Sequence, residues 1–187
     1  MRLQIKKTRP KNIIIFDIEY DQSSLVQLAF LILTKKEPTI FELTKSFNVY
    51  VKPNQSLHSF FTRYTNITND FLCDNGVDLT VAKALVDEVM LDIDLNDTLI
   101  VSHGVQNDLD LLLNNGIDFK RIKEHYCTYN SAKKLLKRNN HLTLQEVAAE
   151  GGYFMFDAHN AYADVWGTLY AFCYLKEIEN GTIDWFW

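Results

Sequence analysis

Apolar residues in the first third of the chain fall into three runs that have the character of β-strands. Residues 13–18 (IIIFDI) are almost continuously apolar, as expected for a buried central strand, and residues 25–33 form a longer apolar run. Residues 40–51 place apolar side chains mostly at every second position, and Pro53 ends the run because it cannot donate a ladder hydrogen bond. The pattern predicts three consecutive strands that form a meander.

Helical spacing of apolar residues dominates the rest of the chain. It predicts helices at residues 79–93, 107–116 and 131–138, and a last long helix over about 160–179. A short apolar run at residues 97–103 predicts one more strand. A meander followed by alternating strands and helices is typical of a mixed α/β fold, in which ligands bind at strand ends.

Residues that favour helix ends support these boundaries. Asn160 suits the N-cap of the last helix, because its side chain can accept a backbone N–H. Thr143 and Glu146 form a capping-box pattern before an apolar run, and Gly151 suits the end of the helix that follows. Gly116 is placed to stop the second predicted helix.

The composition is that of one globular domain, since 187 residues with 47% hydrophobic content supply one sizeable core and little more. Residues 1–11 contain basic side chains and no acid, although the net charge of the chain is −5. We therefore expect a basic N-terminal tail at residues 1–11 and a single domain at residues 12–187. A second basic run consists of Lys133, Lys134, Lys137 and Arg138. Either run could contact phosphates or simply face solvent.

The cysteines and the apolar runs indicate the compartment. Cys73, Cys127 and Cys173 form no CxxC pair, so neither a zinc knuckle nor a disulfide framework is indicated, which fits a reducing environment. The N-terminal residues lack the apolar segment of a signal peptide, and no apolar run approaches the roughly 18 residues that a membrane span needs. We expect a soluble, cytoplasmic protein with no membrane partner.

Two acids at the end of the first buried strand are the first candidate for chemistry. Asp17 and Glu19 are two residues apart and therefore point to the same face of that strand. Carboxylates are rarely buried unless they are paired or bind a metal, and Mg²⁺ prefers oxygen ligands. Taken alone, the pair fits an exposed strand end better than a metal site, because short motifs often occur by chance.

Two further acids and a histidine follow the later strand and begin the last helix. Asp108 and Asp110 lie just past the predicted strand at 97–103, where the helix dipole alone would favour an acid. His159 precedes the last helix and Asp164 lies about one turn inside it, beside residues with core character. Each stretch by itself also fits a solvated helix start.

Together, the three stretches resemble the DEDDh 3′–5′ exonucleases, the family of the DNA polymerase III proofreading subunit and oligoribonuclease. The strand motif D-x-E matches residues 16–19, the motif H-N-x-x-F-D matches residues 103–108, and the motif H-x-x-x-x-D matches residues 159–164. The resemblance implies a ribonuclease H-like α/β fold, with a five-stranded mixed sheet flanked by helices. It implies that two divalent ions, Mg²⁺ or Mn²⁺, are held by Asp17, Glu19, Asp108 and Asp164. It also implies that His159 is the general base.

The sequence departs from this family around the substrate. Tyr20, Asp21 and Gln22 stand where Thr-Thr-Gly is usual, and Gly104 and Asn107 replace the usual Asn and Phe. In the TNIT turn at residues 65–68, Asn66 stands where Gly is usual. The resemblance places the substrate-binding positions at Ile18, Tyr20, His103 and Asn107.

These observations predict a metal-dependent 3′–5′ exonuclease that releases 5′-mononucleotides from single-stranded DNA or RNA ends. A polymerase or another replication or repair protein is the protein partner that the resemblance suggests. The altered substrate positions leave an alternative open, a nuclease-like module that binds nucleic acid or recruits a partner with weak or no catalysis. A third reading is an assembly protein that uses Trp185, Phe186 and Trp187 to bind a partner, although these side chains could equally pack onto the domain.

Overall fold

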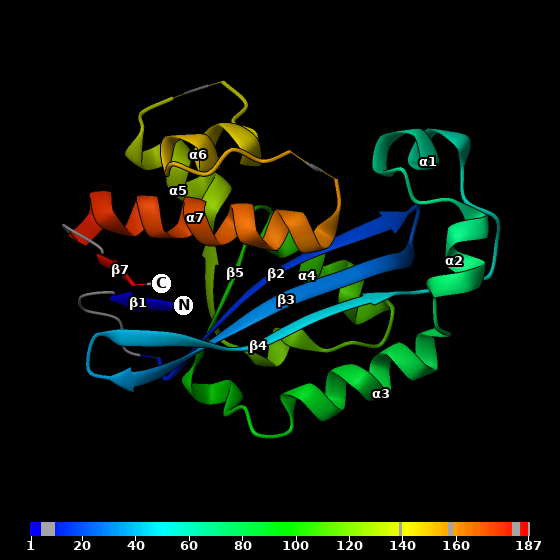
Figure 1. Cartoon of the computed structure of the whole chain (residues 1–187), viewed down its shortest axis with the longest axis horizontal. Coiled ribbons are helices and arrows are strands. Elements are labelled where there is room, and N and C mark those ends of the chain that lie inside the picture. Colours follow the sequence, from blue (N-terminus) through cyan, green and yellow to red (C-terminus); the bar gives the residue numbers. More distant parts are fainter. Residues whose placement is uncertain (5–9, 139, 157–158, 181–183, 187) are drawn as a thin grey trace.

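The computed structural model describes residues 1–4, 10–138, 140–156, 159–180 and 184–186. A mixed sheet of seven strands forms its centre, in the order β6-β5-β2-β3-β4-β1-β7 (Figure 1). The strands are β1 (Arg2–Gln4), β2 (Asn12–Asp21), β3 (Ser24–Glu37), β4 (Ile40–Tyr50), β5 (Thr98–Ser102), β6 (Glu124–Cys127) and β7 (Asp184–Phe186).

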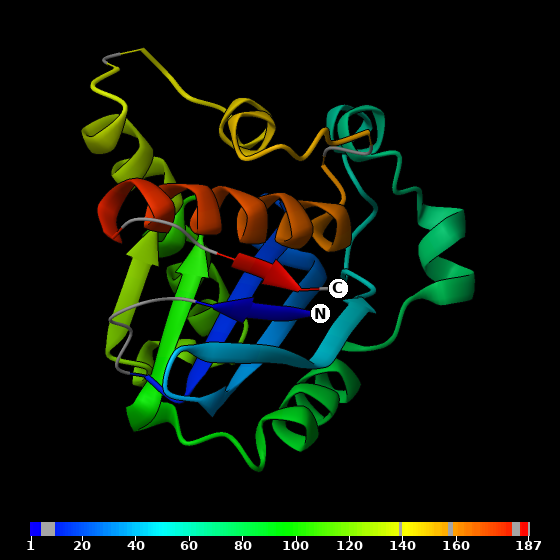
Figure 2. The ribbon, with the colours of Figure 1, turned by 60° about the vertical axis from the view of Figure 1, so that its left-hand side comes forward.

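Strands β6, β5, β2, β3 and β4 form the predicted five-stranded mixed sheet. The strands β2, β3 and β4 pair antiparallel as the expected meander, whereas β5 pairs parallel with both β2 and β6. Two short strands extend this sheet at the β4 edge, where β1 pairs with β4 and β7 pairs with β1 (Figure 2). Residues 2–4, expected in a basic tail, thus belong to a strand. Lys6, Lys7, Arg9 and Trp187 lie outside the described residues.

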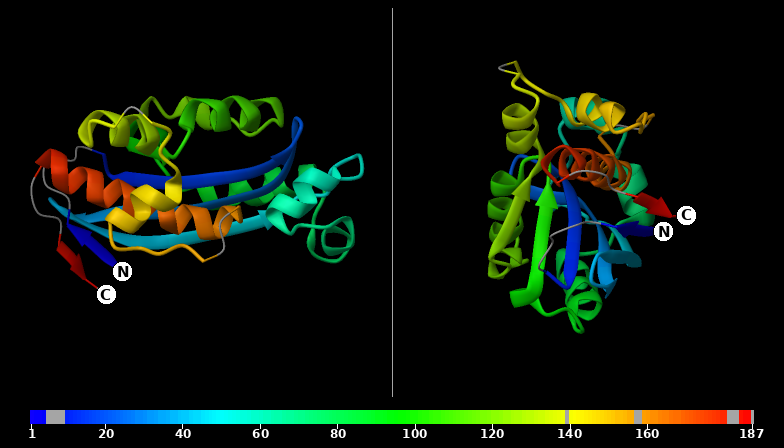
Figure 3. Two further views of the ribbon diagram at one scale, coloured as in Figure 1. Left: turned by 90° about the horizontal axis from the view of Figure 1, so that it is seen from above. Right: turned by 90° about the vertical axis from the view of Figure 1, so that its left-hand side faces the viewer.

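Helices cover both faces of the sheet (Figure 3). They are α1 (Ser59–Thr65), α2 (Asn69–Asn75), α3 (Leu79–Met90), α4 (Val105–Asn114), α5 (Thr128–Leu135), α6 (Leu144–Glu150) and α7 (Ala161–Asn180), with short 3₁₀ turns η1 (Leu95–Asp97) and η2 (Phe119–Arg121). One hydrophobic core lies between the sheet and α7, and a second lies between the sheet and the helices α3 and α4. No helix in the described part of the chain combines the length and apolar character needed to cross a bilayer.

The alternation of side chains along β2 decides where the first acids point. Ile13 and Ile15 pack in the core beneath α7, whereas Ile14 packs in the core on the α3 and α4 side. Since successive side chains of a strand alternate between faces, Asp17 and Glu19 continue the face that α7 covers. Both acids of the central strand therefore lie beneath the start of the last helix.

The predicted caps agree with the structure. Thr143 and Glu146 form a reciprocal capping box at the start of α6, with Thr143 N–H donating to Glu146 Oε2 at 2.8 Å. Asn160 Oδ1 accepts the backbone N–H of Tyr162 at 3.1 Å and so caps α7 as expected. Asn66 ends α1 in the left-handed conformation, with φ of 60°, which asparagine tolerates better than most residues. Its presence where the family usually has glycine is thereby explained.

Candidate active site

The four predicted metal-binding acids come together from three elements. Asp17 and Glu19 lie on β2, Asp108 lies in the first turn of α4, and Asp164 lies in the first turn of α7. All four are at least partly shielded from solvent, and Asp164 is only 9% exposed. The sheet and the two helix starts thus gather four carboxyl groups at one end of the central strand.

Burial and mutual repulsion favour protonated carboxyl groups here. Burial, followed by repulsion from Asp164, Asp108 and Glu19, raises the pKa of Asp17 well above its usual value. Burial, and then repulsion from Asp164 and Asp108, raises the pKa of Glu19 to about 8. The acids are therefore close enough to oppose each other's ionisation, a state that a bound cation would relieve.

Asp108, rather than Asp110, belongs to this cluster. The Ser102 hydroxyl, at the end of β5, donates a hydrogen bond to Asp108 Oδ2. Burial raises the pKa of Asp108 to about 6, and the bond from Ser102 opposes that shift. Asp110 instead forms an ion pair with Lys120 and accepts a bond from Gln106 at the surface.

His159 lies against the acids with its backbone in the left-handed region, at a φ of 67°. Its backbone N–H donates to Asp164 Oδ2 at 3.2 Å. One potential ligand atom from each of Glu19, His159 and Asp164 lies within 4.8 Å of the other two. Burial lowers the pKa of His159, which favours the neutral imidazole that can accept a proton.

Gln27 fixes the start of α7 beside the site, although the sequence patterns did not single it out. It lies opposite Glu19 in the sheet and is fully buried. Its Oε1 accepts the backbone N–H of Ala161 at 3.0 Å, while its Nε2 donates to Asn48 Oδ1 at 2.9 Å and to Asn160 Oδ1 at 3.3 Å. A single amide in the middle of an apolar strand was the available signal, since a buried polar side chain needs partners.

The four predicted substrate-binding positions lie in different environments. Tyr20 is 46% exposed beside Glu19, and Asn107 is exposed in the first turn of α4. Ile18 is buried in the core on the α3 and α4 side, so that its side chain faces away from the acids. His103 is held inside the protein, with Nδ1 2.9 Å from Thr128 Oγ1 and Nε2 3.1 Å from the Leu142 carbonyl oxygen.

A largely apolar pocket adjoins Glu19, and half of its lining, from helix α1 and its N-cap His58, was not anticipated from sequence. The lining residues are Glu19, Tyr20, Asp21, Gln22, His58, Phe60, Phe61 and Tyr64. The residues Phe60 and Tyr64 are 73% and 51% exposed, which is unusual for large aromatic residues. A flat hydrophobic ligand could therefore enter this pocket directly beside the acid cluster.

The donor set fits hard divalent cations. Carboxylate oxygens are the ligands that Mg²⁺ and Mn²⁺ prefer, and the four acids present them from three rigid elements. Ionisation of the buried acids is disfavoured without a nearby positive charge. Asp17, Glu19, Asp108 and Asp164 are thus suited to hold such ions.

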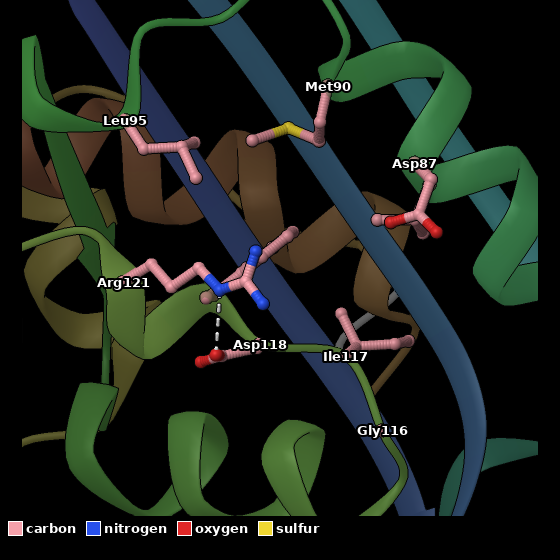
Figure 4. A pocket seen from close by; sticks show the side chains of 9 residues that line it. Asp87, Met90, Leu95, Gly116, Ile117, Asp118 and Arg121 are labelled. Carbon is pink, nitrogen blue, oxygen red and sulfur yellow. Dashed lines mark hydrogen bonds and ion pairs between the residues drawn. The ribbon is translucent and has the colours of Figure 1, made fainter.

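Another cavity lies on the opposite side of the sheet, between α3 and η2 (Figure 4). Met90, Leu95 and Ile117 contribute apolar side chains to it. Arg121 Nε donates to Asp118 Oδ2 at 3.0 Å, which pairs the charges of these two lining residues. This cavity lacks a cluster of opposed acids and is separate from the candidate active site.

Comparisons with known proteins identify the family of the chain. The profile of the exonuclease family (RNase_T) matches residues 14–172. No curated protein matches the chain significantly.

Solved structures show the same fold at low sequence identity. E. coli Exonuclease I in complex with a dT13 oligonucleotide has a TM-score of 0.67 and 16% identity, over 89% of this chain and 41% of that chain. A 3′-exonuclease solved for the specific recognition of a histone mRNA stem-loop at its 3′ end has a TM-score of 0.69 and 17% identity, over 94% of this chain and 84% of that chain. The chain thus spans about two fifths of Exonuclease I.

The family profile spans all four acids, from Asp17 on β2 to Asp164 on α7, and both neighbouring structures share the ribonuclease H-like fold. The chain belongs to the exonuclease family.

Proposed function

We propose that this protein is a metal-dependent 3′–5′ exonuclease that releases 5′-mononucleotides from single-stranded DNA or RNA ends. The observation that carries the proposal is the convergence of Asp17, Glu19, Asp108 and Asp164 beside His159. Four opposed acids and a histidine with a lowered pKa are costly to keep together unless they serve a site.

The four acids would hold two divalent ions, Mg²⁺ or Mn²⁺. When bound, such ions neutralise the charge that develops on the phosphate and orient the attacking and leaving oxygens in line. The acids come from β2, α4 and α7, so they sit on regular elements rather than on free loops. Rigid placement of this kind is what an in-line displacement requires.

His159 would act as the general base. Its neutral imidazole would take a proton from the attacking water as the new bond from oxygen to phosphorus forms. The bond from phosphorus to the 3′ oxygen of the preceding nucleotide then breaks, and that oxygen takes a proton from solvent. The products are a 5′-mononucleotide and a strand one nucleotide shorter.

The aromatic pocket would receive the base of the terminal nucleotide. Tyr20 and Phe60 offer exposed rings beside Glu19, and an unpaired base can stack on such rings with little sequence preference. Tyr20 would take over part of the holding role of the threonine that the family usually has nearby. Stacking requires an unpaired base, so the pocket supports a single-stranded end.

Both DNA and RNA are proposed substrates. One neighbouring structure binds a dT13 oligonucleotide and the other recognises a histone mRNA stem-loop. The positions that usually contact the terminal sugar and base are altered here, so they do not favour either sugar. A polymerase or another replication or repair protein stays a proposal from the family resemblance alone.

The test uses 5′-labelled single-stranded DNA and RNA of equal sequence, incubated with Mg²⁺, with Mn²⁺ or with EDTA. We expect a ladder that shortens from the 3′ end with either metal and not with EDTA. Asp17→Ala should abolish cleavage while the protein stays folded. Asp110→Ala is the matched control, because it removes an acid that pairs with Lys120 outside the cluster and only two residues from Asp108, and it should cleave normally.

The competing proposal is a nuclease-like module that binds nucleic acid or a partner. The observation in its favour is the altered turn at Tyr20, Asp21 and Gln22 beside otherwise complete acids. It predicts tight, metal-independent binding of the oligonucleotides without shortening. Absence of cleavage with both metals, together with such binding, would replace the exonuclease proposal.

A further inference from the structure

The ring of Tyr64 stacks directly on the ring of His159. Their centroids are 3.7 Å apart and their planes are inclined by 31°. Tyr64 also lies near parallel to Phe60, with centroids 5.9 Å apart and planes inclined by 13°. Tyr64 thus contacts both an aromatic ring of its own helix and the candidate base.

This contact restrains the imidazole without using its nitrogens. Both ring nitrogens lie in the plane of an imidazole, so a partner on one face leaves them available for hydrogen bonds. The hydrogen bond from His159 to Asp164 uses the backbone N–H and leaves the side-chain torsions undetermined. Among the described residues, Tyr64 is therefore the ring that limits where the imidazole can turn.

Helix α1, which carries Tyr64, is tied to the strand that carries the acids. At the end of β2, Asp21 Oδ2 accepts the backbone N–H of His58 at 2.7 Å, directly before α1 begins. Phe61 of the same helix packs with Val26 of β3 in a small hydrophobic cluster. The position of Tyr64 is therefore set by the strands that also set Asp17 and Glu19.

We propose that Tyr64 is a positioning residue for His159, with its ring holding the imidazole in place for proton transfer. This inference rests on the proposed function, because it presumes that His159 is the base. Tyr64 itself takes no proton and acts through the histidine. Small misplacements of a catalytic group can slow a reaction by up to about 100-fold, so loss of the ring should be measurable.

The kinetic test compares single-turnover and steady-state cleavage of a labelled single-stranded oligonucleotide by the full chain. Tyr64→Leu should lower kcat by about 10- to 100-fold. Tyr64→Phe keeps the ring and should retain at least about half of kcat. Tyr174→Leu, which removes a tyrosine at the far end of α7 that bonds Glu150, should cleave like the wild type.

A double mutant separates positioning from base stacking. If Tyr64 acts through His159, Tyr64→Leu should change kcat by less than about 2-fold in a His159→Ala background, because the group that it positions is gone. If Tyr64 instead stacks on the substrate base, Tyr64→Leu should raise KM, leave kcat unchanged and act equally in both backgrounds. That second result would overturn the proposal.

Nuclear magnetic resonance supplies a readout that needs no activity. The ring protons of His159 should be displaced by the ring current of residue 64 in the wild type and in Tyr64→Phe, and should return toward ordinary values in Tyr64→Leu. Identical His159 spectra in all three proteins would overturn the stacked arrangement. If the wild type cleaves and Tyr64→Leu has a normal kcat, the positioning role of Tyr64 is overturned and the proposed function stands. If the wild type itself does not cleave, the proposed function is overturned.

Discussion

Burial opposes the ionisation of the acids in the candidate site. Glu19 has a pKa of about 8 and Asp108 a pKa of about 6, mainly because both carboxyl groups are shielded from water. At neutral pH the metal-free protein therefore retains a proton on Glu19 that this residue would lose in the unfolded chain, whereas Asp108 is mostly ionised. Metal binding must displace that proton, which links affinity for the ions to pH.

The metal-free protein should lose stability as the pH rises. The pKa of Glu19 is raised from 4.5 to about 8 on folding, so the folded state binds more protons than the unfolded state between these values. Thermal unfolding in EDTA should give a Tm that falls from about pH 5 to about pH 8. Glu19→Gln should flatten this fall, and a Tm that rises over the same range in wild type would contradict the assignment.

Removal of the candidate base should slow the reaction without loss of metal binding. We expect His159→Ala to reduce the single-turnover rate by about 10²- to 10⁴-fold, which is typical for loss of a general base. Affinity for Mn²⁺, measured by calorimetry on the variant, should change little because the four acids remain. A large loss of Mn²⁺ affinity would instead identify His159 as a metal ligand.

At the scale of elements, the site depends on how α7 is attached to the sheet. Gln27 joins β3 to the first turn of this helix, and the same turn contains His159 and Asp164 at its margins. Asn160 Nδ2 also lies 3.4 Å from the Tyr50 hydroxyl of β4. The polar bonds therefore align the end of the sheet with the helix that completes the acid cluster.

Gln27→Leu should weaken both the fold and the site. It leaves the buried N–H of Ala161 without its acceptor, which typically costs about 1–3 kcal/mol. Urea unfolding should show this loss, and cleavage should fall because the start of α7 is less well placed. Gln145→Leu, an exposed position on α6, is the control and should lie within about 0.5 kcal/mol of wild type. Equal stability of the two variants would show that Gln27 does not anchor the helix.

The long elements could be predicted from sequence, whereas several of the short ones could not. The strands β2, β3 and β4 and the helices α3 and α7 each contain enough residues for their periodicity to stand out. Helices α1 and α2 have seven residues each and β6 has four, so a periodic pattern is barely defined. Helix α5 begins at Thr128 rather than residue 131, because the strand before it ends at Cys127.

The grouping of the acids in the candidate site could be predicted from motifs, but the residues that support this grouping could not. Asp17 and Glu19 are two residues apart, and Asp164 follows His159 by five residues, and both spacings are visible in the chain. Gln27 and Tyr64 take part through contacts between distant segments, which depend on the packing of α1 and α7. Residues in such contacts are far apart in the sequence and follow no regular spacing, so no sequence pattern identifies them.

At the scale of the whole molecule, the site and the added strands occupy different parts of one sheet. Strand β2 lies near the middle of the sheet, and β3, β4 and β1 separate it from β7 at the edge. The terminal segments lie side by side at that edge (Figure 2). The edge can therefore affect stability without touching the acids.

A chain that ends at Asn180 should remain active. Strand β7 pairs with β1 over three residues, so its loss should lower the Tm by only a few degrees, at about 2–4 °C for each kcal/mol lost. The initial rate on a single-stranded oligonucleotide should stay within about 2-fold of the full chain. Loss of cleavage in a truncated protein that remains folded would show that the C-terminal segment contributes to the site.

The two-residue repeat of β2 also limits how this sequence can change in length. One residue inserted between Ile13 and Asp17 would reverse the faces of everything that follows, and both acids would enter the core beside α3 and α4. Substitutions along β2 can be absorbed by repacking, but a single insertion or deletion there cannot. The turn between β3 and β4 lies near the start of β2, whereas the acids lie near its end. Homologous sequences should therefore vary in length at this turn and keep the length of β2 constant.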